Sequence, residues 1–402
     1  MKKRYAAAQA VVLTMLASTL VQAQSLTSVT SLYVGYSSRR VTANPTGELK
    51  ARLDSLDGEL AVAIRFGRTG ELRRLLAKGM TLLAARPWND IADFNSSLLL
   101  RTDRVVVESS KPYAVRIEQL YSPNIALTRS LTAHATLTAR AAANQPPSIV
   151  KELGVFDGVS RDLRESPFPM EFDLHDVADG RYVVTVELRD SARTIGTTSL
   201  PIVLKKGIDD AVAGLERDAG RAPAVLRDEI LFPVDRMRNV NRGRLELRTL
   251  DIDKDFAAAR AVLASVQSGK DPFTGRTGDM ERHYRLDAAN EIMPYRLYIP
   301  SKYNAKQGAP LIIALHGLGA TEDSFFESYG PTFLQLAEAS GYIVAAPLGY
   351  RVDGGYGWGV GAPPADALAK RNSELSEVDV MQTLEQVKKH YNVDPNRTYL
   401  MG

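Results

Sequence analysis

The chain has no cysteine among its 402 residues. Disulfide bonds, thiolate nucleophiles and cysteine-based zinc sites are therefore excluded. A protein without disulfides needs domains large enough to bury stabilising apolar cores, and this length is typical of two or three such domains.

An excess of charge of one sign is also lacking. The 50 Lys and Arg residues and the 47 Asp and Glu residues leave a net charge of +3, and the two signs are interspersed along the chain. Proteins that bind nucleic acids carry basic stripes or patches, so we expect no nucleic acid partner.

The common metal and phosphate motifs are absent as well. The sequence contains no His-Glu-x-x-His, no aspartate-rich loop and no glycine-rich phosphate loop. We therefore expect no metal ion and no cofactor. His134 and His175 stand alone in a β-rich segment, and we interpret them as structural or exposed residues.

A long apolar run occurs at the start of the chain. Met1–Arg4 is basic, the run extends from Ala6 to about Leu20, and Val21-Gln22-Ala23 forms a small-x-small cleavage pattern. This order is typical of a secretory signal peptide over residues 1–23, with an uncleaved anchor as the alternative. Because the run is short for a bilayer, we expect no stable membrane span and an exported protein, periplasmic or extracellular.

Helical periodicity dominates residues 24–100. Leucines such as Leu49 and Leu53 recur at three- and four-residue spacing, which predicts amphipathic helices. Lys78-Gly79 is interpreted as a helix C-cap. We expect this segment to serve as a packing unit.

The periodicity changes to two in residues 101–207. Short β-rich runs alternate with turn signals there, which predicts an immunoglobulin-like β-sandwich. Residues 208–280 become helical again, and we interpret them as a helical linker region that ends in turns between Asp271 and Gly278.

Strand and helix patterns alternate in residues 281–402. Apolar runs predict strands at 295–300, 311–315, 342–347 and 398–401, and helical patterns occupy about 325–339 and 376–391. Ser376 to Asp379 is interpreted as a capping box that starts the second helix. This order predicts a multidomain protein whose last domain is a doubly wound, mostly parallel α/β sheet.

Two motifs in this last domain carry chemistry. The strand at 311–315 runs directly into His316-Gly317-Leu318-Gly319, and the last strand ends on Gly402. In a Gly-x-Ser-x-Gly nucleophile elbow, a strand ends on the first glycine and the serine follows two positions later. An ordinary glycine turn after a buried strand is the alternative interpretation of Gly402.

Three sequence motifs follow one another in this region: PYRLYIP from Pro294, LIIALHGLG from Leu311 and NVDPNRTYLMG from Asn392. With these motifs, residues 295–402 resemble the first half of an α/β-hydrolase of the secreted esterase type, similar to polyhydroxybutyrate depolymerases and feruloyl esterases. The resemblance covers about a quarter of the chain. It implies an α/β-hydrolase fold that is incomplete at Gly402.

The same resemblance implies roles for individual residues. Gly317 and Leu318 would form the oxyanion hole, with the Leu318 amide as donor and His316 as its packed support. His316 as the catalytic base is the alternative. The nucleophile, the acid and the base would follow Gly402, so we expect no catalytic residue within this chain and no activity from the chain alone.

A glycine-rich stretch follows the strand at 342–347. Tyr356 and Trp358 lie in it, and they are interpreted as a substrate-binding rim, with a plain surface loop as the alternative.

The sequence therefore favours an exported serine hydrolase that acts on carboxylic esters, or on a polyester, through an acyl-enzyme. Two alternatives stay open. One is a prolyl-oligopeptidase-like peptidase, because an accessory β domain before the hydrolase domain suits that family too. The other is a non-catalytic exported protein whose upstream regions bind a polymer or a cell surface.

Export makes a direct prediction. When the protein is secreted from a Gram-negative host, intact-mass spectrometry should find a mature N-terminus near Gln24, because cleavage is expected after Ala23. An exported protein that keeps Met1 would contradict this expectation.

Overall fold

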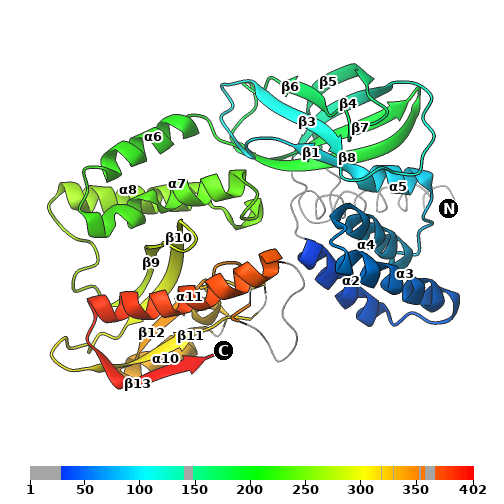
Figure 1. Ribbon diagram of the computed structural model, residues 1–402. Coiled ribbons are helices and arrows are strands. Elements are labelled where there is room, and N and C mark those ends of the chain that lie inside the picture. Colours follow the sequence, from blue (N-terminus) through cyan, green and yellow to red (C-terminus); the bar gives the residue numbers. More distant parts are fainter. Residues whose placement is uncertain (1–28, 140–147, 318, 329, 353–354, 358–366) are drawn as a thin grey trace, which may run out of the picture. The chain divides into compact units, whose positions relative to one another are not determined.

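The computed structural model describes residues 29–139, 148–317, 319–328, 330–352, 355–357 and 367–402 (Figure 1). The signal peptide predicted for residues 1–23 lies outside this range. The chain divides into two compact units, Met1–Asp209 with Val240–Arg248 and Asp210–Asn239 with Thr249–Gly402. None of the helices in the described ranges has the length and apolarity that crossing a bilayer requires.

Helices occupy the first part of unit one. They are α2 (Val29–Ala43), α3 (Gly47–Arg65), α4 (Thr69–Leu83) and α5 (Asp90–Ser97). Leucines at helical spacing, including Leu53 and Leu76, pack around the buried ring of Tyr36. The C-cap predicted at Gly79 is wrong, because α4 continues to Leu83. Gly79 lies where α4 meets Tyr36, and a Cβ there would come within 2.5 Å of that ring.

Two sheets follow in the same unit. One has the strand order β1-β3-β6 and the other β2-β8-β7-β4-β5. Their strands are β1 (Leu98–Arg101), β2 (Val106–Val107), β3 (Tyr113–Gln119), β4 (Leu131–Ala139), β5 (Ile149–Val159), β6 (Phe168–Phe172), β7 (Gly180–Asp190) and β8 (Arg193–Leu204). Buried and less buried residues alternate along β3 and β4, as expected for strands with one face in a core. The immunoglobulin-like assignment stays a prediction.

The helices α6 (Ile208–Ala219), α7 (Arg227–Asn241) and α8 (Ile252–Gln267) come next. Most of this segment, which the sequence suggested as a linker, groups with the last domain in unit two. The connection is a buried ion cluster. Glu229 of α7 accepts hydrogen bonds from Arg282 Nε at 2.6 Å and lies 2.7 Å from His283 Nδ1, and both partners belong to strand β9 (Gly278–Leu286).

The environment of His283 strengthens that connection. Its ring stacks on Phe232 of α7 at a centroid distance of 3.8 Å. Burial alone would lower the pKa of His283, but Glu229 and Glu281 outweigh it and raise the pKa to about 9. The imidazolium is therefore the stable form at neutral pH, and it links the helix to the sheet by charge as well as by packing.

A mixed five-stranded sheet forms the centre of unit two. Its order is β13-β11-β12-β10-β9 (Figure 1). The remaining strands are β10 (Glu291–Ile299), β11 (Ala309–Ala314), β12 (Ile343–Pro347) and β13 (Val393–Met401). β11 pairs in parallel with β12 and β13, whereas β10 is antiparallel to β9 and β12. Four strands therefore share one direction, and β10 is the exception that the strand pattern did not predict.

Helices cover both faces of this sheet. They are α9 (Ser324–Glu327), α10 (Gly330–Ser340) and α11 (Ala367–His390). Val344 belongs to the core that contains Ala337 of α10. The strand register places Ala345 on the opposite face with Tyr284, whose hydroxyl bonds Asp379 of α11. The double winding expected from the sequence is present in the described residues.

The Glu229 cluster predicts a large stability effect. Glu229→Gln should destabilise unit two by about 3–5 kcal/mol at neutral pH, because it leaves buried Arg282 and His283 without their counter-charge. The stability that protonated His283 contributes is fully present below pH 6.5 and is lost as the pH rises through about 9. The difference in unfolding free energy between the parent and Glu229→Gln should therefore shrink over that range. Denaturant unfolding and hydrogen exchange of β9 peptides measure it.

Glu385→Gln is the control, since this exposed α11 carboxylate meets Lys388 at 3.3 Å on the surface. Its effect should stay within about 0.5 kcal/mol. Equal effects of the two variants would contradict a supporting role for the buried cluster.

Candidate active site

The parallel pairing of β11 with β13 brings the two chemical motifs together. Leu315 N donates to Met401 O at 2.7 Å, just where both strands end. His316-Gly317 continues from one strand and Gly402 from the other. The two motifs therefore lie side by side at the carboxyl edge of the sheet, where α/β proteins place their sites.

His316 is buried, with 8% of its surface exposed. Its Nε2 lies 2.7 Å from the carbonyl oxygen of Leu348, and its Nδ1 lies 2.8 Å from that of Gly317. A carbonyl oxygen only accepts, so each ring nitrogen can bond here only as a donor. Neither nitrogen is placed to take a proton from a nucleophile.

The loop after β12, residues 348–357, also lies at the carboxyl edge of the sheet. Gly319 N donates to Val352 O at 2.7 Å, which joins this loop to the loop after β11. Tyr350 has a positive φ of 59°, and its hydroxyl donates to Glu291 Oε1 at 3.1 Å. Arg351 also bonds buried Glu291, at 2.9 Å, so β10 holds this loop from a second side.

Helix α11 supplies further bonds to the same loop. The capping box predicted at Ser376 is wrong, because α11 begins at Ala367 and both Ser376 and Asp379 lie inside it. Asp379 Oδ2 accepts from Gly349 N at 2.7 Å, and Oδ1 accepts from the Tyr284 hydroxyl at 2.5 Å. Burial raises the pKa of Asp379 to about 6 despite these bonds. Ser376 and Asp379 therefore bond the loop after β12 and do not start the helix.

Glu322 is a second buried acid near the turn. It is 5% exposed, and its Oε2 has no hydrogen-bond partner among the described residues. Burial and the neighbouring Asp323 carboxylate raise its pKa to about 8. Burial therefore favours the neutral form of this carboxyl group.

Three of the predicted site residues lie within the described ranges, and their roles stay predictions. Gly317 is exposed at the sheet edge, and His316 packs beneath it. Tyr356 is half-buried, and its ring meets the His316 ring edge-on at a centroid distance of 5.6 Å. Leu318 and Trp358 lie outside the described residues.

Sequence reasoning missed the anchors Asp379, Ser376, Tyr284 and Glu291. A weak signal for two of them was present. Ser376 and Asp379 share the buried face of α11 with Thr383 and Val387, so polar residues stand where an amphipathic helix normally has apolar ones. Such positions indicate side chains with buried polar partners.

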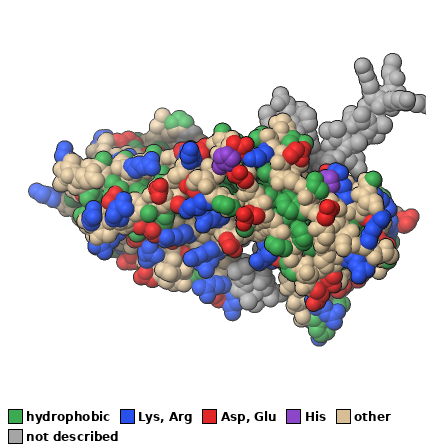
Figure 2. Space-filling view, turned by 90° about the horizontal axis from the view of Figure 1, so that it is seen from above, with side chains coloured by type: hydrophobic (Ala, Val, Ile, Leu, Met, Phe, Trp, Pro, Cys, Tyr) green, Lys and Arg blue, Asp and Glu red, His purple; other side chains and the backbone are tan. Residues whose placement is uncertain are grey.

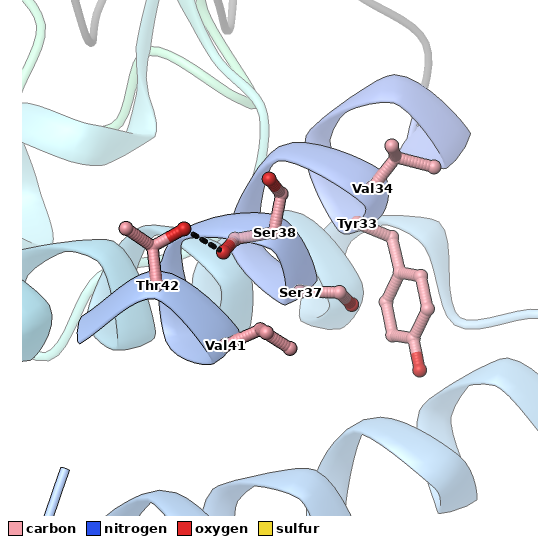
Figure 3. Close-up of a pocket in the computed structure, with 6 residues that line it drawn as sticks. All are labelled: Tyr33, Val34, Ser37, Ser38, Val41 and Thr42. Atoms are coloured by element: carbon pink, nitrogen blue, oxygen red, sulfur yellow. Dashed lines mark hydrogen bonds between the residues drawn. The ribbon is translucent and has the colours of Figure 1, made fainter. Parts of the chain in front are cut away.

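An open hollow lies on α2 of unit one (Figure 3). Six residues of that single helix line it, namely Tyr33, Val34, Ser37, Ser38, Val41 and Thr42. Ser38 and Thr42 are joined by the Thr42 hydroxyl donating to the Ser38 carbonyl at 3.0 Å. These six lining residues include no carboxylate, lysine, arginine or histidine.

The surface and the metal-binding potential add two observations. On the face in Figure 2, basic and acidic side chains are interspersed. Within the described ranges, no group of three or more His, Asp or Glu side chains has an arrangement that could hold a metal ion.

Comparisons with known proteins point toward ester-hydrolysing enzymes. A bifunctional acetylxylan esterase/xylanase of Neocallimastix patriciarum is 29% identical over 106 residues, which are 26% of this chain and 13% of that protein. The chain thus matches about an eighth of that relative's length. No family model matches the chain.

Solved structures with some similarity are esterases or hydrolases by name. An S-formylglutathione hydrolase of Agrobacterium tumefaciens is 16% identical, with a TM-score of 0.25 over 30% of this chain and 47% of that one. A ferulic acid esterase of Anaeromyces mucronatus is 17% identical, with a TM-score of 0.24 over 33% of this chain and 51% of that one. These TM-scores are too low for the likeness to support any conclusion.

Gly349 provides a test of how tightly the loop is packed. Gly349→Ala should destabilise unit two by more than Gly355→Ala, although both glycines have positive φ, 73° and 69°. The left-handed backbone costs each variant about 1 kcal/mol. A Cβ at Gly349 would also lie 2.6 Å from the Tyr356 ring, whereas nothing lies within 4 Å of one at Gly355. Denaturant midpoints of the two variants measure the difference, and equal losses would contradict close packing of Tyr356.

Proposed function

We propose that residues 281–402 form the first half of the α/β domain of a serine esterase. The observation that carries this proposal is the β11–β13 pairing, which sets the His316-Gly317 turn beside Gly402. A serine two positions after Gly402 would emerge next to that turn. The esterase name of the curated relative supports the same reaction class.

The proposed chemistry is acyl transfer to water. The serine hydroxyl attacks the ester carbonyl carbon, and its proton leaves to a base. The carbon–oxygen bond to the alcohol then breaks, and the alcohol departs with that proton. Water attacks the acyl-enzyme in the same way, which releases the acid and the free serine.

The turn after β11 would stabilise the oxyanion formed in each attack. His316 Nδ1 lies 2.8 Å from the Gly317 carbonyl oxygen. The resemblance implies the Leu318 amide as the donor to the oxyanion. Each preorganised donor of this kind is worth about 3–4 kcal/mol in the transition state. We assign His316 as a positioning residue, Gly317 and Leu318 as the oxyanion hole, and Tyr356 and Trp358 as the substrate rim.

The finer parts of the proposal concern location and substrate. We propose that the protein is exported to the periplasm or beyond and that the leader at residues 1–23 is cleaved. We also propose an ester or polyester substrate of the kind that polyhydroxybutyrate depolymerases or feruloyl esterases hydrolyse. The first unit would then serve as an accessory region of an exported enzyme.

The proposal predicts the reactivity of serines. A fluorophosphonate probe should not label the chain that ends at Gly402, because Ser376 is fully buried and its hydroxyl already donates to backbone carbonyls. Protein expressed from the gene read past the Gly402 codon should be labelled at the serine two positions beyond. Peptide mass spectrometry locates the label, and its appearance on Ser324 or Ser376 would contradict the proposed site.

A further inference from the structure

Helix α11 carries three buried polar side chains on one face. Ser373, Ser376 and Asp379 follow one another at three-residue spacing and are 4%, 0% and 0% exposed. All three bond the backbone of the loop after β12, residues 348–357. Ser373 donates to Gly357 O, near the far end of the loop, while the other two meet at Gly349.

Gly349 is held at both of its backbone polar groups. Its N–H donates to Asp379 Oδ2 at 2.7 Å, and its carbonyl accepts from the Ser376 hydroxyl. We call Ser376 and Asp379 the Gly349 clamp. The second oxygen of Asp379 accepts from the Tyr284 hydroxyl, which anchors the clamp to β9. Hydrogen bonds to a carboxylate are stronger than neutral ones, so Asp379 is a firm attachment point.

Asp379 acts on the same peptide unit as His316, and Ser376 acts on the next one, through the Gly349 carbonyl. The Gly349 N–H and the Leu348 carbonyl belong to one planar peptide group and point in opposite directions. Asp379 holds the N–H side, and His316 Nε2 holds the carbonyl side at 2.7 Å. This plane cannot rotate without breaking both bonds. The His316 ring is thereby held in the orientation that places its Nδ1 2.8 Å from the Gly317 carbonyl oxygen.

We propose that Ser376 and Asp379 are positioning residues that orient the oxyanion turn through the two peptides that meet at Gly349 and through His316. The proposal rests on the esterase function proposed above, because it assigns these residues to that reaction. They touch neither substrate nor reacting atoms. Asp379 acts directly on the Leu348–Gly349 peptide, Ser376 acts on the adjoining Gly349–Tyr350 peptide, and both effects reach the turn through the His316 ring.

Imidazole NMR tests the clamp without any assay of hydrolysis. In chain labelled with ¹⁵N-histidine, Ser376→Ala should shift the His316 ring resonances and speed exchange of its Nε2 proton. His283, held by Glu229 in the same unit, should not change and reports that unit two stays folded. Ser373→Ala is the matched control, since it removes the same hydroxyl one turn away, and it should leave His316 unchanged.

Asp379→Asn is the second variant, because the amide oxygen still accepts from Gly349 while the charge is lost. It should shift the His316 ring resonances in the same direction as Ser376→Ala does. An unchanged His316 in folded Ser376→Ala protein would overturn the clamp. An equal shift in Ser373→Ala would also overturn it, because the effect would then belong to the whole loop.

Kinetics test the catalytic side in protein that extends past Gly402, with p-nitrophenyl acetate as the probe. Ser376→Ala should lower kcat about tenfold or more with KM within about twofold, the pattern of an interaction made in the transition state. Ser373→Ala should keep kcat, because Ser373 bonds Gly357 and not the peptides at Gly349. Hydrolysis that is equal in the parent and in Ser376→Ala would overturn the positioning role. Absence of hydrolysis in the parent, with the NMR effects present, would instead reject the proposed esterase function and leave the clamp as a structural feature.

Discussion

The loop after β12 depends on one physical constraint, which is that buried backbone polar groups need partners. The described residues of this loop, 348–352 and 355–357, form no strand or helix that could provide them. Asp379 and Ser376 of α11 and His316 of the loop after β11 bond its backbone instead, while Glu291 of β10 bonds its side chains. Its position at the carboxyl edge of the sheet is set by bonds from three directions.

The same constraint explains why His316 suits support better than proton transfer. A catalytic base needs one ring nitrogen facing the nucleophile and the other facing an acceptor that orients the ring. Both nitrogens of His316 face backbone carbonyls from two loops. Its ring joins these loops, and the half-buried ring of Tyr356 packs against it. His316 and Tyr356 thus lie between the loop after β11 and the loop after β12.

A second buried network ties the helices α7 and α8 into the sheet unit. The Glu229 cluster is nearly fully buried, and breaking it exposes two cations to an apolar interior, which is costly. Arg236 adds a pair with Asp255 between the two helices. These helices therefore belong to the sheet unit energetically as well as by contact. Charged residues in this segment looked like an exposed linker in the sequence, because sequence alone does not show whether a charge has a buried partner.

The sequence by itself determined the features that arise from local pattern. The unbroken apolar runs at 311–315 and 342–347 are strands, because a run without polar alternation is buried on both faces of a sheet. The place of the His316-Gly317 turn after β11 followed directly. Tertiary structure alone decided what depends on distant partners. The reversed direction of β10, the early start of α11 at Ala367 and the pairing of Asp379 with Gly349, 30 residues away, are of this kind. A helical residue's own neighbours set its periodicity, but a buried polar group is stabilised by whichever group the fold brings within hydrogen-bond reach, and no local pattern encodes that group.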